Sequence, residues 1–192
     1  MIIGLTGTNG SGKGTVATYF KEKGFQYHSL SDELRMLMKV EGIEITLPNL
    51  VTWGNNIRRN NGADYLAQLV IKNIKDDEDE EASSPGNHII DSIRNPGELE
   101  AIKKAFGKDF RMVAVDAPID VRYERVQKRA REDDKQSLEE FKHNEEVQLK
   151  NSDPSQQQLT AVMEAADVKL DNSGSVDDLH KELEKLHAGG KK

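Results

Sequence analysis

The sequence predicts an α/β fold in which a parallel sheet is covered by helices on both faces. Short apolar runs of strand length alternate with segments whose apolar residues recur at helical spacing. Strands separated by helices form parallel sheets with helices on both faces. A glycine-rich turn joins the first such strand to the first helix. The 192 residues suffice for a domain with its own core, so we expect a single domain over 1–192.

The first half of the chain alternates between strand and helix patterns. The expected strands cover residues 2–6, 25–30 and 88–93, and the expected helices cover 13–23, 31–40, 47–60 and 63–75. Gly7 ends the first strand and Gly24 ends the first helix, as glycine often does. The last of these helices carries its apolar residues on one face, which is typical of a helix packed on a core.

The second half of the chain continues this alternation. Asn95 followed by Pro96 has the pattern of a helix N-cap with proline at the first helical position, and Gly107 ends that helix. Two more strands are expected at 110–115 and 168–170, and four more helices at 118–131, 137–150, 153–166 and from 176 onward. Residues 76–87 are acidic and turn-rich, which indicates a solvated loop, and 188–192 are expected to be a frayed tail.

The composition excludes several classes of function. Acidic residues outnumber basic ones by 34 to 27, so the net charge of −7 gives no general attraction for DNA or RNA. The chain has no cysteine, which excludes disulfides, iron–sulfur clusters, thiolate zinc sites and cysteine nucleophiles. No apolar run approaches the roughly 18 residues of a membrane span, and the N-terminus has no signal-peptide pattern. We therefore expect a cytoplasmic protein without membrane or nucleic-acid partners.

The segment from Gly7 to Thr15 has the chemistry of a phosphate-binding loop (P-loop). It matches G-x-x-x-x-G-K and lies between an expected strand and an expected helix. Glycines let the backbone wrap a phosphate chain, and the new helix presents its positive end to the same phosphates. Lys13 is expected to bridge the transferring phosphates. The expected ATP-binding residues of the loop are Gly7, Asn9, Gly10, Ser11, Gly12, Lys13, Gly14 and Thr15.

Gly14 stands where many P-loops have the Ser or Thr that binds Mg²⁺. Thr15 follows one position later, so metal binding is expected to involve Thr15, water and a carboxylate. The alternative interpretation is a glycine-rich turn that binds no nucleotide.

Several motifs beside this loop resemble the P-loop small-molecule kinases, in the group of nucleoside monophosphate kinases and dephospho-CoA kinases. The segments similar to dephospho-CoA kinases are Ile3-Gly-Leu-Thr-Gly with Gly10-Ser-Gly-Lys, Val113-Ala-Val-Asp-Ala, Arg125-Val-Gln-Lys-Arg129 and Ala166-Asp-Val-Lys-Leu-Asp-Asn-Ser-Gly174. Ser31-Asp-Glu-Leu-Arg35 resembles the G-D-x-L-R element of adenylate kinases. Gly54-Asn-Asn-Ile-Arg-Arg59 and Ile90-Asp-Ser-Ile-Arg94 resemble acceptor-site elements of deoxynucleoside monophosphate kinases.

This resemblance implies a three-layer fold whose five-stranded parallel sheet has the strand order 2-3-1-4-5. It implies ATP as the phosphoryl donor and Mg²⁺ as the cofactor. It also implies an acceptor-binding helical insert at about 31–75 and a lid at about 122–153.

Asp91 and Arg94 follow the third expected strand, where ligands of open α/β sheets bind. A carboxylate at this edge can orient the waters of Mg²⁺, and an arginine can clamp a phosphate. We expect Asp91 to act in catalysis, touching the metal through water, and Arg94 to bind the acceptor. The alternative is a local salt bridge or a helix cap.

Asp32 and Arg35 follow the second expected strand. Asp32 is also a suitable helix N-cap residue, and capping alone is the alternative to a site role. The resemblance makes Arg35 a ligand of the acceptor phosphate. Arg58 and Arg59 are adjacent and cannot share one helix face, so at most one of them is expected at the acceptor site, and we assign Arg58.

Arg122, Arg125 and Arg129 recur on one face of an expected helix. One interpretation is a solvated face paired with Glu124 and Glu132. The other is a lid helix whose arginines close over the triphosphate and exclude water. The resemblance implies that Arg125 lies near the adenine and Arg129 near the phosphates.

Asp116 and the histidines are the remaining residues of a type that could form a site. Asp116 ends the fourth expected strand and is a weaker site candidate. The five histidines show no metal-ligand spacing, and we interpret them as structural or surface residues.

The expected reaction is the transfer of the ATP γ-phosphoryl group to a nucleoside or deoxynucleoside monophosphate, by a monomer or homodimer. One alternative is a dephospho-CoA kinase, whose hydroxyl acceptor needs a base, for which Asp32 is the candidate. A monophosphate attacks through an oxygen that is already ionised at neutral pH. The second alternative is a nucleotide-binding regulatory module without catalysis, whose partner would be an enzyme of nucleotide metabolism.

Overall fold

The computed structural model describes residues 1–77, 86–129, 137–149, 153 and 155–189. Its centre is a five-stranded parallel sheet in the order β2-β3-β1-β4-β5, which confirms the expected fold class. The strands are β1 (Ile2–Gly7), β2 (Gln26–Ser29), β3 (His88–Asp91), β4 (Phe110–Asp116) and β5 (Val168–Asp171).

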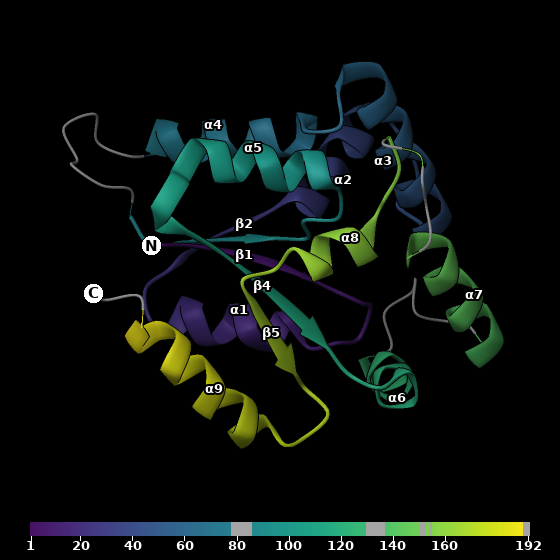
Figure 1. The fold of residues 1–192 in the computed structure, drawn as a ribbon. Coiled ribbons are helices and arrows are strands. Elements are labelled where there is room, and N and C mark those ends of the chain that lie inside the picture. The colour runs from purple at the N-terminus through teal and green to yellow at the C-terminus, as the bar shows by residue number, and fades with distance from the viewer. Residues whose placement is uncertain (78–85, 130–136, 150–152, 154, 190–192) are drawn as a thin grey trace.

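Helices of the described chain cover the sheet on both faces (Figure 1). They are α1 (Lys13–Glu22), α2 (Leu30–Val40), α3 (Leu47–Asn61), α4 (Tyr65–Asp77), α5 (Pro96–Phe106), α6 (Ile119–Arg129), α7 (Leu138–Leu149), α8 (Leu159–Glu164) and α9 (Val176–Gly189), with a short 3₁₀ turn at Gly107–Asp109. Among the described residues, no helix combines the length and the apolar character that crossing a membrane requires.

Successive residues of the central strands face opposite sides of the sheet, and both sides are buried. Ile2 and Ile90 belong to a core that includes residues of α2, α3, α4, α5 and α8. Ile3 and Ile89 belong to a second core, formed with α1 and α9. This alternation follows from the two-residue period of a strand, and burial on both faces explains why the strands are continuous apolar runs.

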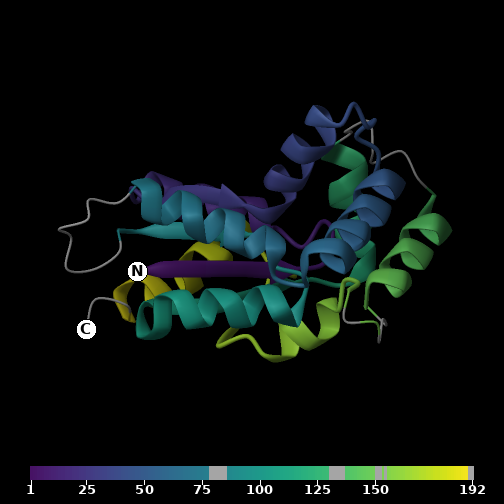
Figure 2. The same ribbon diagram turned by 90° about the horizontal axis from the view of Figure 1, so that it is seen from above.

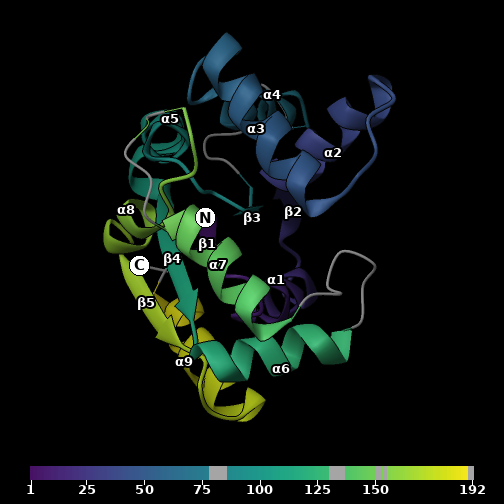
Figure 3. The ribbon, with the colours of Figure 1, turned by 90° about the vertical axis from the view of Figure 1, so that its right-hand side faces the viewer.

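The carboxyl ends of the five strands meet at one edge of the sheet, because all strand pairs are parallel. In Figure 2, β1 points toward the end of the molecule where α3 (blue) and α7 (green) lie. Figure 3 views that end, with α2 and α3 on one side and α6 and α7 across from them. Ligands of open α/β sheets bind at this edge.

Capping residues set the starts of two helices at this edge. The Asn95 side chain accepts a hydrogen bond from Gly97 N (2.8 Å) and Glu98 accepts one from Asn95 N (3.0 Å), a capping box that confirms the expected N-cap. At α2, the hydroxyl of Ser29 accepts from Asp32 N at 3.3 Å. Ser29 is therefore the N-cap, and the alternative that Asp32 itself caps the helix is wrong.

The segment ahead of β5 differs from the expected helix over 153–166, because α8 begins only at Leu159. The carboxylate of Asp153 accepts from Ser155 N at 2.9 Å, and Gln156 N donates to Asp153 O at 2.9 Å. Such local hydrogen bonds from an aspartate favour a turn over a helix. The chain then bonds to the loop after β3 instead of starting a helix.

Several expectations fall outside the described residues. They concern 78–85 of the acidic segment, 130–136 and 150–152 of the proposed lid, and 190–192 of the tail.

Candidate functional site

The loop between β1 and α1 has the backbone geometry of a P-loop. Gly10 and Gly12 have φ values of 77° and 101°, in the left-handed region that favours glycine. A Cβ at Gly10 would lie 2.6 Å from the carbonyl oxygen of Arg122, and one at Gly12 would overlap the amide nitrogen of Asn172. Gly12 O accepts from Thr15 N and Val16 N, at 3.0 and 3.2 Å, so the loop closes directly into the first turn of α1. Glycine is therefore required where the chain bends back.

The Lys13 side chain lies across the inside of this loop. Its ammonium donates to Gly7 O at 2.7 Å and to Thr8 O at 2.9 Å, which leaves one of its three N–H donors for a ligand. Burial lowers the pKa of Lys13 to about 8, although the carboxylate of Asp91 acts in the opposite direction. Lys13 is therefore a desolvated cation, for which a phosphate is a matching ligand.

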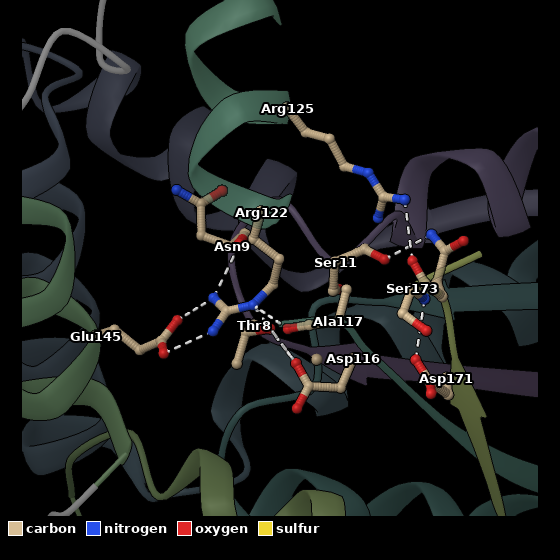
Figure 4. A network of polar contacts seen from close by, with 12 residues as sticks. Thr8, Asn9, Ser11, Asp116, Ala117, Arg122, Arg125, Glu145, Asp171 and Ser173 are labelled. Atoms are coloured by element: carbon tan, nitrogen blue, oxygen red, sulfur yellow. Dashed lines mark hydrogen bonds and ion pairs between the residues drawn. The ribbon is translucent and has the colours of Figure 1, made fainter. Parts of the chain in front are cut away.

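Arg122 supports the P-loop through a network of polar contacts (Figure 4). Its guanidinium donates to Ala117 O at 2.6 Å and to Asn9 O at 3.3 Å, and it pairs with both carboxylate oxygens of Glu145 on α7, one of them at 2.8 Å. Asp116 accepts from the Thr8 hydroxyl at 2.7 Å and lies 3.6 Å from the same guanidinium. Neither a solvated face nor a lid arginine over the triphosphate describes Arg122, because these partners bury it beneath the loop.

Arg125 and Arg129 lie on the pocket side of α6. Arg125 donates to Asn172 O at 2.9 Å, and the Asn172 side chain donates to Ser11 O at 2.8 Å (Figure 4). A second guanidinium nitrogen of Arg125 is buried and has no hydrogen-bond partner in the described part of the chain. Arg129 lies 3.4 Å from the side-chain oxygen of Asn9. Both arginines therefore lie beside the P-loop, with one buried donor of Arg125 left for a ligand.

Asp91, at the end of β3, is held by two donors. The Tyr27 hydroxyl donates to one carboxylate oxygen at 2.9 Å, and Ser92 N donates to the other at 2.6 Å. Burial and the neighbouring Asp91 raise the pKa of Tyr27, so its hydroxyl stays a donor. Ser92 has a φ of 68°, rare for a residue other than glycine, which is consistent with a constrained turn at this position.

Arg58 and Glu98 form a buried ion pair between α3 and α5. The side chains are 3% and 0% exposed, and two guanidinium nitrogens of Arg58 contact one Glu98 oxygen, each at 2.8 Å. The other Glu98 oxygen accepts from Arg94 N and Asn95 N, at 2.8 and 3.0 Å. The third nitrogen of Arg58, Nη1, is buried without a partner among the described residues. Arg59 lies elsewhere, 3.8 Å from Asp153.

Arg94 and Arg35 complete this side of the site. The Arg94 guanidinium donates to the side-chain oxygen of Gln157 at 3.3 Å, and burial lowers its pKa, opposed by Asp91. Arg35 is half-exposed and pairs with Asp32 at 3.1 Å. Within the described residues, the second carboxylate oxygen of Asp32 has no hydrogen bond.

One pocket of about 940 Å³ joins these groups. Its polar lining includes residues from six separate segments: Asn9, Gly10, Gly12, Lys13, Gly14, Thr15, Tyr27, Asp32, Arg35, Arg58, Asp91, Arg94, Arg125, Arg129 and Gln157. Its apolar lining includes Leu34 and Leu66 from α2 and α4. The P-loop, the arginines of α2, α3 and α6, and Arg94 after β3 therefore share one space, whose volume lies in the range of about 300–1,000 Å³ typical of ligand pockets.

Sequence reasoning missed three polar residues that line or support the pocket. Tyr27 lies inside an expected strand, where an aromatic residue has an ordinary packing role. In the sequence, Glu98 is recognisable only as part of a helix start. Its ion pair joins α5 to α3 through Arg58, which lies 40 residues earlier in the chain. Gln157 lies where a helix was expected. The pairing of Glu98 with Arg58 becomes visible only when the fold brings α3 and α5 together.

The oxygen ligands of the pocket fit a hydrated Mg²⁺. The described residues contain no cluster of three or more His, Asp or Glu side chains that could enclose a metal ion. Mg²⁺ keeps several waters and is usually bound by one or two carboxylates together with substrate phosphates. The Asp91 carboxylate and the Thr15 hydroxyl both line the pocket and are ligands of that kind.

Residues 3–151 match the family model AAA_18, described as an AAA domain. The chain belongs to this family of AAA domains. The match begins in β1 and ends beyond α7, so it includes the P-loop and the arginines of α3 and α6. The family is one of P-loop NTPases, which agrees with the nucleotide-binding geometry of the loop.

Relatives with curated sequences cover nearly the whole chain. A UPF0200 protein of Thermococcus kodakarensis is 30% identical over 189 residues, 97% of this chain and 96% of its own length. A UPF0200/UPF0201 protein of Archaeoglobus fulgidus is 32% identical over 185 residues, 96% of this chain, but the match spans only 54% of that longer protein. Neither name states an activity.

A likeness to solved structures confirms the fold. A shikimate kinase of Acinetobacter baumannii in complex with shikimate has a TM-score of 0.57 at 18% identity, covering 99% of this chain and 94% of that one. At this identity the likeness concerns architecture alone. The protein therefore has the fold of P-loop small-molecule kinases.

Proposed function

We propose that the protein transfers the γ-phosphoryl group of ATP to a nucleoside or deoxynucleoside monophosphate. The observation that carries this proposal is the single pocket in which Lys13 of the P-loop and the guanidinium groups of Arg58 and Arg94 lie together. Phosphoryl transfer depends on holding donor and acceptor in line and on neutralising charge. A pocket with cations at both ends meets both needs.

The donor end is the P-loop with α6. Backbone N–H groups of the loop and the start of α1 would bind the β- and γ-phosphates, and Lys13 would neutralise charge on the transferring group. The unpartnered nitrogen of Arg125 would bind the base or ribose of the nucleotide. Arg129 would contact the phosphates. Mg²⁺, when bound through Asp91 and Thr15, would neutralise the phosphate oxygens of the donor.

The acceptor end is formed by α2, α3 and the loop after β3. Arg58 Nη1 is a buried donor without a partner among the residues that the structure describes, and leaving such a donor unsatisfied costs about 1–3 kcal/mol. An acceptor phosphate would satisfy it together with Arg94 and Arg35. The similarity of residues 31–35, 54–59 and 90–94 to monophosphate kinase elements supports a monophosphate as this acceptor.

A hydroxyl acceptor, as in dephospho-CoA, is the second candidate. The observation in its favour is that Asp32 lines the pocket with one carboxylate oxygen that has no hydrogen bond within the described residues, and this oxygen would act as the base. The Arg35 guanidinium on the other oxygen keeps this carboxylate near the acceptor end.

Acceptor-stimulated ADP formation tests the proposal. We would measure it with Mg-ATP across ribo- and deoxynucleoside monophosphates and dephospho-CoA, and record product masses. A nucleoside diphosphate product is the expected result and identifies the acceptor base. A CoA product would transfer the assignment to the hydroxyl acceptor. Tight ATP binding without stimulation by any acceptor would contradict catalysis and favour a regulatory module.

A further inference from the structure

A turn ahead of α8 lies against the loop after β3, at the acceptor end of the pocket. Three hydrogen bonds join the two segments. Gln158 N donates to Arg94 O at 2.9 Å, the Asn95 side chain donates to Gln156 O at 2.7 Å, and Arg94 Nη1 donates to Gln157 Oε1 at 3.3 Å. Since Glu98 accepts from Arg94 N, both backbone polar groups and the side chain of Arg94 are held.

The contact with Arg94 decides how the Gln157 amide is oriented. A guanidinium has only donors, so the amide must present its oxygen to Arg94 and its NH₂ group to the other side. Gln157 is 7% exposed and lines the pocket. Its Nε2 has no hydrogen bond within the described residues. Gln157 therefore offers the pocket an almost buried donor next to Arg94.

The neutral partner of Arg94 also distinguishes it from the other two acceptor-side arginines. Arg58 is paired with Glu98 and Arg35 with Asp32, each through a direct ion pair. A neutral amide positions a guanidinium without neutralising its charge. A carboxylate positions the guanidinium and also neutralises its charge. In the described part of the chain, the hydrogen-bond partner of the Arg94 side chain is thus an amide and not a carboxylate, although Asp91 lies near enough to act on its charge.

We propose that Gln157 is a specificity-determining residue of the acceptor site, which binds a phosphate oxygen of the acceptor through Nε2 while holding Arg94 through Oε1. The ligand is a phosphate monoester that presents one oxygen to Arg94 and another to Gln157. This inference rests on the proposed function for the identity of the acceptor, and its phosphate-binding chemistry can be measured without turnover.

Binding of inorganic phosphate tests the role of Gln157. The measurement is made in saturating ADP, so that the P-loop is already occupied. Phosphate would be titrated into the wild-type protein and Gln157→Glu, an almost isosteric change that places a carboxylate against Arg94. We expect Gln157→Glu to weaken phosphate binding at least about tenfold, with ADP affinity unchanged. Gln26→Glu is the matched control, because it makes the same charge change on an exposed residue. Gln26 is the first residue of β2, whereas the pocket lies at the carboxyl ends of the strands.

A second variant separates binding from folding. Gln157→Met keeps the length of the side chain and introduces no charge, and we expect it to weaken phosphate binding about threefold or more while thermal stability stays within a few degrees of wild type. With an acceptor that is turned over, both Gln157 variants should raise its KM and leave the KM of ATP unchanged. A purely structural role would raise both.

The outcomes separate this inference from the proposed function. Equal phosphate affinity in wild type and Gln157→Glu, or no phosphate binding by the wild type, would overturn the role of Gln157. Phosphate binding that depends on Gln157, without transfer to any acceptor, would overturn only the proposed function.

Discussion

Lys13 is the residue whose chemistry the structure describes most completely. It is desolvated inside the P-loop, and burial brings its pKa down to about 8. A bound triphosphate favours the charged ammonium and raises this pKa. We therefore expect ATP to bind most tightly below pH 8, where the free protein already has the proton, and to bind more weakly as the pH rises further.

We accordingly expect the Kd of ATP to rise about tenfold between pH 7 and pH 9, measured by calorimetry at constant ionic strength. Lys13→Met should bind ATP more weakly at every pH and show a nearly flat profile over the same interval. If Lys13→Met keeps the slope of the wild type, another group is responsible for the pH dependence.

Replacing the Asp32 carboxylate distinguishes a monophosphate acceptor from a hydroxyl acceptor. With a monophosphate acceptor, Asp32→Asn should lower kcat by less than about tenfold, because no proton has to be removed. With a hydroxyl acceptor the loss should be about 10²- to 10⁴-fold, the contribution of a general base. Glu33→Gln is the matched control, since Glu33 is adjacent and contacts Asn73 instead of the pocket. Equal losses with every acceptor would remove this distinction.

At the scale of elements, α3 and α5 are joined by the buried pair of Arg58 and Glu98. Removing one partner of a buried ion pair leaves the other charge without compensation and destabilises a protein by about 3–5 kcal/mol. Glu98 in addition satisfies two backbone N–H groups at the start of α5.

Glu98→Ala should therefore lower the free energy of unfolding by about 3 kcal/mol or more, measured by urea denaturation. Glu100→Ala, an exposed change on the same helix, should alter it by less than about 0.5 kcal/mol. A small effect of Glu98→Ala would mean that Arg58 finds solvent or another partner, and that it does not depend on Glu98 for its position.

The elements also show what the sequence alone can and cannot predict. The strands, the P-loop and the Asn95 cap were predictable because each depends on local residue patterns. Arg122 was misassigned because helical periodicity identifies a shared face but not the partner of that face, which is Glu145 on a later helix. Gln157 and Tyr27 were missed because their roles depend on contacts across more than 60 residues of chain.

At the scale of the whole molecule, the sheet places two cationic sites at one edge. The P-loop follows β1 and the Arg94 loop follows β3, and these strands are neighbours, so the two loops open into one pocket. The fold and the family establish a P-loop NTPase with the architecture of small-molecule kinases. In the function we propose, the acceptor phosphate lies in this pocket beside the donor phosphates.

Binding of adenosine 5′-pentaphosphate tests that claim without knowledge of the acceptor base. Its two extra phosphates would reach from the P-loop toward Arg94, so we expect a Kd about 100-fold below that of ATP, because the second contact becomes intramolecular. Arg94→Ala should remove most of this difference and leave the affinity for ATP nearly unchanged. Equal affinity of the wild type for the two ligands, or equal weakening of both by Arg94→Ala, would contradict the shared pocket.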